Sequence, residues 1–152
     1  MWAGLDAEFY LALAAGHEGC QEVVDRLKCG LLLLPTAYQE IADLIINTQD
    51  EEIRERALDA LKFMSIYGVT QAPHPRHNVG TDDGLAGLLL QSGLLTEDQK
   101  DSALILGEAS CLSVKYLLTL DPTLVGLNRT KLRQAIESRD LAHFEIVTIP
   151  HP

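Results

Sequence analysis

Four acidic residues in this sequence have the chemistry and the placement to form a reactive site. Each lies next to an end of a predicted strand or helix: Asp6, Glu40, Asp101 and Asp121. Ligands of an open parallel sheet bind at the carboxyl ends of its strands, so Asp6 and Asp121, which follow apolar runs, are expected to share one crevice. If the helices that carry Glu40 and Asp101 flank it, the four carboxylates repel one another unless cations are bound. Hard oxygen ligands of this kind select Mg²⁺ or Mn²⁺.

A purely structural interpretation of each acid stays open at this point. An aspartate that ends a strand before a proline, as Asp121 does before Pro122, is commonly a turn former. Glu40 and Asp101 follow predicted helix starts, where a negative charge favours the helix dipole. Asp101 also shares a helical face with two glutamates, one of them Glu108, which is typical of a solvated stripe.

The elements that must position these acids alternate along the chain, and the alternation predicts an α/β sheet. Predicted strands cover residues 2–5, 31–34, 116–120 and 144–149, and residues 68–79 are predicted to be extended and then a loop. Predicted helices cover residues 9–15, 18–27, 81–91, 96–112 and 130–139, and two more start at residues 35–36 and 50–52. The run 31–34 is apolar throughout, as expected for a strand covered on both faces.

Local signals indicate where several helices begin and end. Thr36 with Gln39, and Thr96 with Gln99, have the spacing of a capping box, in which side chains satisfy the free N–H groups of a helix start. Two glycines are predicted to close the helices before them, at Gly30 and Gly68.

Composition limits the class of protein. The 152 residues predict one domain, residues 1–152, and 47% hydrophobic with 22% charged residues is the globular average. The net charge of −10 argues against broad electrostatic capture of nucleic acid, although a small basic rim around an acidic, metal-loaded pocket is compatible with it.

The sequence predicts a cytoplasmic protein without a membrane segment. No apolar run approaches the roughly 20 residues needed to cross a bilayer. Asp6 and Glu8 interrupt the first apolar stretch and no Lys or Arg precedes it, so we expect no signal peptide. Three cysteines without C-x-x-C spacing are expected to be reduced thiols: Cys20, Cys29 and Cys111. His17 and Cys20 are separated by two residues, as some zinc ligands are, but two further ligands for zinc are missing.

The order of these motifs resembles the PIN-domain ribonucleases over nearly the whole chain. The resemblance lies in Gly4-Leu5-Asp6 before a leucine-rich helix, Pro35-Thr36-Ala37-Tyr38-Gln39-Glu40-Ile41-Ala42, Asp101-Ser102-Ala103-Leu104-Ile105-Leu106-Gly107-Glu108-Ala109, and Tyr116-Leu117-Leu118-Thr119-Leu120-Asp121. The first motif departs from the Asp-Thr-Asn common in the family, because Glu8 stands at the Asn position.

The resemblance implies a PIN-like fold, three-layer α/β/α with a mostly parallel central sheet, and an Mg²⁺- or Mn²⁺-dependent endoribonuclease. In a two-metal mechanism one ion lowers the pKa of a water and a second neutralises the leaving oxygen. Asp6 and Asp121 would be the direct metal ligands, and Glu40 and Asp101 would complete the acidic pocket. Thr119 would orient an aspartate or a water through its hydroxyl.

The resemblance further implies RNA as substrate, an antitoxin protein as partner and a homodimer. Basic residues that could contact the RNA backbone are Arg129, Lys131 and Arg133, with Arg76 and Lys100 as weaker candidates. Two other interpretations stay open. One is a non-catalytic PIN-like scaffold that binds proteins. The other is a haloacid-dehalogenase-like phosphohydrolase, whose usual Asp-x-Asp or Asp-x-Thr is broken here by Glu8.

Overall fold

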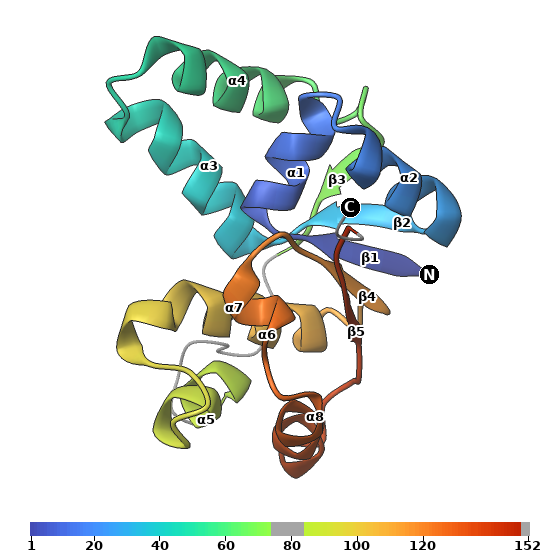
Figure 1. Cartoon of the computed structure of the whole chain (residues 1–152), viewed down its shortest axis with the longest axis vertical. Helices are drawn as coiled ribbons and strands as arrows, with labels where there is room; N and C mark the ends of the chain where they lie inside the picture. Colours follow the sequence, from blue (N-terminus) through green and yellow to red (C-terminus); the bar gives the residue numbers. More distant parts are fainter. Residues whose placement is uncertain (74–83, 150–152) are drawn as a thin grey trace.

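A five-stranded sheet forms the centre of the computed structural model, which describes residues 1–73 and 84–149 (Figure 1). The strands are β1 (Trp2–Leu5), β2 (Gly30–Leu33), β3 (Val69–Gln71), β4 (Tyr116–Leu118) and β5 (Glu145–Val147). Their order is β3-β2-β1-β4-β5, and every neighbouring pair is parallel. The predicted α/β class with a mostly parallel sheet is therefore confirmed.

Helices cover both faces of this sheet. One group connects β1, β2 and β3: α1 (Ala7–Ala14), α2 (Glu18–Leu27), α3 (Pro35–Asn47) and α4 (Glu51–Lys62). The other group follows β3: α5 (Leu85–Gln91), a 3₁₀ turn η1 (Glu97–Gln99), α6 (Lys100–Cys111), α7 (Pro122–Val125) and α8 (Arg129–Ser138). Figure 1 shows the first group on one side of the sheet and the second group on the other, which makes three layers.

The direction of the chain across the sheet reverses between β1 and β4. From β1 it steps outward through β2 to β3, and then returns to β4 on the other side of β1. Because β-α-β crossovers are right-handed, the connections of the two halves lie on opposite faces. The loops after β1 and β4 therefore diverge and leave a crevice at their carboxyl ends, where parallel sheets bind ligands.

Burial of the central strands explains their apolar sequence. Leu5, Leu33, Leu117 and Leu118 have no exposed surface, as expected for strands covered by helices on both faces. Gly30 is required beside Trp2, because an added Cβ would lie 2.5 Å from the indole ring. This residue is the first of β2 and not the end of the preceding helix; α2 ends through Lys28, whose φ is +53°.

One of the two predicted capping boxes is present and the other is wrong. Thr96 and Gln99 form the box that starts η1 and leads into α6. At α3 the N-cap residue is Leu34, whose apolar side chain cannot accept a hydrogen bond from the helix start. Thr36 lies inside the first turn of this helix. Pro35 at the first helical position explains the shift, because its fixed φ and missing N–H suit a helix start.

Several predicted boundaries differ from the observed ones. The strand predicted at 116–120 ends at Leu118, because the chain then turns and Asp121 becomes the N-cap of α7, a helix that was not predicted. The strand predicted at 144–149 is β5, and the helix predicted to run to Gly68 is α4, which ends at Lys62. Predictions that fall on residues 74–83 lie outside the described residues.

The spacing of His17 and Cys20 is explained by a helix start. His17 is the N-cap of α2, and its Nδ1 accepts a hydrogen bond from the backbone N–H of Cys20 at 3.3 Å. All three cysteines are free thiols. Within the described residues, no helix has the length and apolar character to span a membrane.

Candidate active site

The four predicted carboxylates line one cavity of about 160 Å³ at the carboxyl ends of β1 and β4. Asp6 follows β1 and Asp121 lies shortly after β4, while Glu40 comes from α3 and Asp101 from α6. Glu8, in the first turn of α1, adds a fifth carboxylate. The described residues that complete the lining are apolar or neutral, so no cationic side chain faces this cavity: Ala7, Ser102, Ile105 and Leu124.

Asp6 is held firmly at the junction of β1 and α1. Its backbone N–H donates to the Leu118 carbonyl at 3.2 Å, which joins the ends of β1 and β4. Its Oδ1 accepts from the Phe9 N–H at 2.9 Å, which caps α1, and its Oδ2 accepts from the Thr119 hydroxyl. Asp6 is only 6% exposed, so its carboxylate has little freedom to turn away from the cavity.

Thr119 links the two aspartates that follow the central strands. The residue is completely buried, and its hydroxyl donates to Asp6 while accepting from the backbone N–H of Asp121 at 2.9 Å. The predicted contact between Thr119 and an aspartate is therefore present. One hydroxyl thus sets the relative placement of Asp6 and Asp121.

Asp121 is also fixed through both of its carboxylate oxygens. Oδ1 accepts from the Thr123 N–H at 3.0 Å and so caps α7, and Oδ2 accepts from the Ser102 hydroxyl at 2.8 Å. The capping role confirms the local interpretation of Asp121, and the cavity shows that the same carboxylate also faces the other acids. Ser102 was not predicted as a site residue, although its position directly after Asp101 was the available signal.

Glu108 fastens the helix that carries Glu40 to the helix that carries Asp101. Its Oε1 accepts from the Thr36 N–H at 3.0 Å and its Oε2 accepts from the Thr36 hydroxyl at 2.7 Å. The carboxylate thus replaces the absent side-chain cap of α3 from α6, at the positive end of the helix dipole. Glu108 is only 6% exposed, so the alternative of a solvated stripe does not hold for this residue.

The electrostatics of the cavity disfavour a full set of charges. Burial, and after it the nearby carboxylates of Asp101, Asp6, Glu8 and Asp121 in that order of importance, together raise the pKa of Glu40 to about 7. Burial also raises the pKa of Asp6 to about 6, against the lowering effect of its hydrogen bonds from Thr119 and Phe9. Burial and repulsion between carboxylates both destabilise the charged form of these acids, and a nearby cation would stabilise it.

The donor set fits a hard divalent cation, although it is not gathered around one point. Among the residues that the structure describes, no three His, Cys, Asp or Glu side chains are arranged so that they could hold a metal ion as they stand. The cavity nevertheless offers carboxylate oxygens from several elements and no competing cation. Oxygen donors of this type suit Mg²⁺ and Mn²⁺.

Four of the five basic residues predicted to contact RNA are described by the structure, and none of these four lines the cavity. Arg129 donates to three backbone carbonyls around the end of α7, and Arg133 lines a cleft between α8 and β5. Lys131 borders a separate hollow, Lys100 is an exposed residue at the start of α6, and Arg76 lies outside the described residues.

The chain resembles known proteins in its fold. No protein-family model matches the chain, and no curated protein matches it. Its structure is similar to a crystal structure of VapBC2 from Rickettsia felis bound to a DNA fragment from their promoter, with a TM-score of 0.60 and 14% identity. The match covers 99% of this chain and all of the other. At this identity the likeness establishes the fold, and the chain therefore has the PIN-like three-layer α/β/α architecture that its motifs resemble.

Proposed function

We propose that this chain is a divalent-metal-dependent endoribonuclease that hydrolyses RNA phosphodiester bonds. The observation that carries the proposal is the gathering of Asp6, Glu40, Asp101 and Asp121 in one cavity where β1 and β4 diverge. The likeness to a VapBC2 structure supports this interpretation over a haloacid-dehalogenase-like phosphohydrolase.

The acids divide the work according to how they are held. Asp6 and Asp121 each have both oxygens oriented by hydrogen bonds, so they are suited to be the direct ligands of Mg²⁺ or Mn²⁺. Glu40 and Asp101 complete the negative pocket from the flanking helices. When bound, the ions supply an activated water and neutralise the leaving oxygen. No side chain of the cavity has to act as a nucleophile.

The hydroxyl groups of Thr119 and Ser102 serve as positioning groups in this proposal. Each donates to an aspartate oxygen, and this donation stabilises the charged form that a cation requires. Thr119 also receives the Asp121 N–H, so the hydroxyl cannot easily turn toward solvent. These contacts fix the orientation of both carboxylates, which line the cavity.

We also propose that the protein is the toxin of a toxin-antitoxin pair, that it binds an antitoxin protein and that it forms a homodimer. The similar structure is a VapBC2 assembly with promoter DNA, which supports a protein partner. Exposed isoleucines and a leucine on α3, α4 and the following turn offer apolar surface for protein contacts: Ile46, Ile53, Leu58 and Ile66. Sedimentation of the chain alone and with the product of the adjacent reading frame tests both assemblies.

Cleavage of single-stranded RNA tests the proposed activity. We expect cutting in Mn²⁺ or Mg²⁺, none in excess EDTA, and a large loss of cleavage for Asp6→Asn, because a neutral amide binds a divalent cation much more weakly than a carboxylate. Asp50→Asn is the matched control, since Asp50 is also a helix N-cap but is exposed and remote from the cavity. Equal cleavage by the parent and Asp6→Asn, across several RNAs and both metals, would leave the non-catalytic scaffold as the better interpretation.

A further inference from the structure

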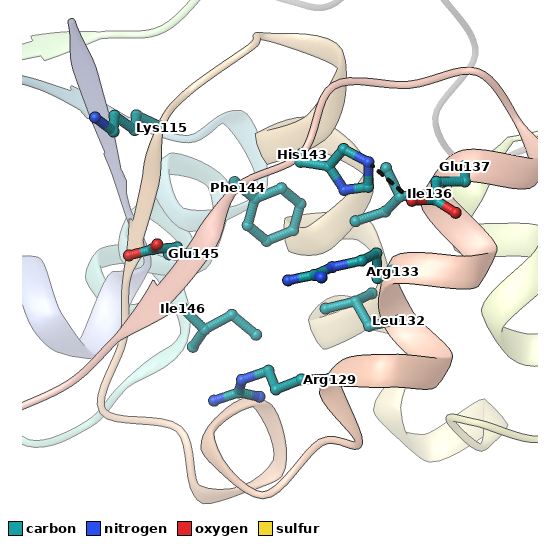
Figure 2. A pocket seen from close by; sticks show the side chains of 10 residues that line it. All are labelled: Lys115, Arg129, Leu132, Arg133, Ile136, Glu137, His143, Phe144, Glu145 and Ile146. Atoms are coloured by element: carbon teal, nitrogen blue, oxygen red, sulfur yellow. Dashed lines mark ion pairs between the residues drawn. The ribbon is translucent and has the colours of Figure 1, made fainter.

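A second and larger cleft, of about 610 Å³, lies between α8 and β5. Figure 2 shows its two walls, with Leu132 and Ile136 on the helix and Phe144 and Ile146 on the strand side. The volume is within the range of small-ligand sites, roughly 300–1,000 Å³. Phe144 remains partly exposed, so part of its surface is open to a ligand.

Cationic side chains surround the apolar walls of this cleft. Three of the 12 basic residues of a chain with net charge −10 border it: Lys115, Arg129 and Arg133. Two acids also border it. Glu137 is paired with His143 at 3.5 Å, and Glu145 lies at the start of β5. Figure 2 shows Arg133 reaching from α8 into the space between Phe144 and Leu132. The cleft thus joins an aromatic face to guanidinium groups.

Arg129 connects this cleft to the carboxylate cavity. Its Nη1 donates at 3.0 Å to the carbonyl of Leu124, whose residue lines the carboxylate cavity, while Arg129 itself lines the cleft. Further bonds to Leu127 and Val125 hold the guanidinium in place. A guanidinium has five N–H donors, so donors remain for an additional acceptor. The end of the cleft at Arg129 is therefore the one that approaches the carboxylate cavity across α7, while Phe144 lies farther along, at the amino end of β5.

The chemistry of the cleft favours a nucleic acid over an added peptide strand. Within β5, Glu145 and Val147 direct backbone groups to the β4 side, through Glu145 N–H to Lys115 at 2.9 Å and Thr119 N–H to Val147 at 3.0 Å. Because backbone groups alternate in direction along a parallel strand, Ile146 is the residue of β5 whose N–H and C=O face the open edge. One such residue offers too few backbone hydrogen bonds to hold an added peptide strand. Guanidinium forks suit phosphate, and an aromatic face suits a base.

We infer that the cleft between α8 and β5 binds a nucleotide of the same single-stranded RNA that enters the carboxylate cavity. Arg133 and Arg129 contact the phosphate, and Phe144 stacks on the base. This inference rests on the proposed ribonuclease function and assigns its substrate-binding surface. It also explains how an acidic protein holds a polyanion, since the attraction is confined to one cleft.

Binding of a fluorescent eight-nucleotide single-stranded RNA, followed by anisotropy in EDTA, tests the assignment. We expect Arg133→Ala to weaken binding about fivefold or more and to lower the slope of log K against log salt by about 0.7, the value for one lost phosphate contact on a single strand. Phe144→Leu keeps an apolar side chain and should weaken binding roughly fivefold through loss of stacking. Arg139→Ala is the control, because Arg139 is an exposed arginine at the end of the same helix that does not line the cleft.

The outcomes separate this inference from the proposed activity. Unchanged binding by Arg133→Ala and Phe144→Leu, or no binding by the parent, overturns the RNA site. A parent that cuts RNA in Mn²⁺ while both variants retain its KM leaves the activity standing and removes the site. RNA that binds through Arg133 and Phe144 without being cut leaves the site standing and removes the activity. Binding of an acidic peptide with the same dependence, in place of RNA, also overturns the inference.

Discussion

Replacing Asp6 with asparagine should stabilise the metal-free protein at alkaline pH. Asparagine has nearly the same shape and caps helices as well as aspartate, so the acceptor for the Phe9 N–H is retained. The substitution removes a charge from a site that is only 6% exposed and is surrounded by other carboxylates. A stability gain on loss of a buried charge is the expected result when no cation is bound.

The magnitude follows from the pKa of Asp6, which rises from 3.8 to about 6 in the folded protein. A difference of about two units at about 1.4 kcal/mol per unit corresponds to roughly 3 kcal/mol. Between these two values the folded state holds a proton that the unfolded state has lost. The stabilisation by that proton is fully present below about pH 3.8 and is lost as the pH rises through about 6. Asparagine has no such loss, so the advantage of Asp6→Asn grows with pH and levels off above about pH 7.

Urea unfolding in EDTA between pH 4.5 and 8 measures this difference. At pH 8 we expect the variant to be more stable by about 1–3 kcal/mol, the lower figure allowing for a weaker hydrogen bond to Thr119. Asp50→Asn, at the exposed N-cap of α4, should stay within about 1 kcal/mol of the parent and follow its pH dependence. An Asp6→Asn protein that is less stable than the parent at pH 8, or a gap that does not widen with pH, would refute the reasoning.

Two further predictions concern the metal and the helix that carries Glu40. Millimolar Mn²⁺ should raise the melting temperature of the parent at pH 8, since a ligand that binds only the folded state stabilises it. Asp121→Asn should lose most of that rise. An identical response of both proteins in a thermal melt would show that Asp121 is not a ligand. Glu108→Gln should lower the unfolding free energy by about 1–2 kcal/mol, because a neutral amide removes the charge from the start of α3 and the charge assistance from both contacts with Thr36. Exposed Glu97→Gln in the same denaturant titration is the comparison, and equal stabilities would contradict the role given to Glu108.

The order of the elements could be predicted because its signals are local. Apolar runs mark β1, β2 and β4, and the helices between them have the capping residues and polar faces of amphipathic helices. Asp6 and Asp121 could be placed near one another for the same reason, since both come at the carboxyl ends of predicted parallel strands. The acidic residues were thus found from the ends of elements, without knowledge of their contacts.

The error at α3 shows the limit of such signals. Thr36 and Gln39 have the spacing of a capping box, but Pro35 moves the helix start and Thr36 donates to Glu108, which is 72 residues away. A sequence pattern reports only neighbours along the chain, whereas a cap can be supplied by any element packed against the helix end. A solvated position for Glu108 stays open from the sequence, because the helical pattern does not show that α3 packs against this face.

Local sequence patterns predict most of the strands and helices, α7 excepted, and the acids that follow two of the strands, because backbone conformation depends on nearby residues. The packing of distant segments decided that the Thr119 hydroxyl joins Asp6, 113 residues earlier, to the backbone of Asp121. It also decided that Arg129 fastens α7 and that Arg133 and Phe144 face one cleft. These contacts depend on how α8 packs beside β5 and how β1 lies beside β4. The contacting residues are far apart along the chain, so no local sequence pattern indicates this packing.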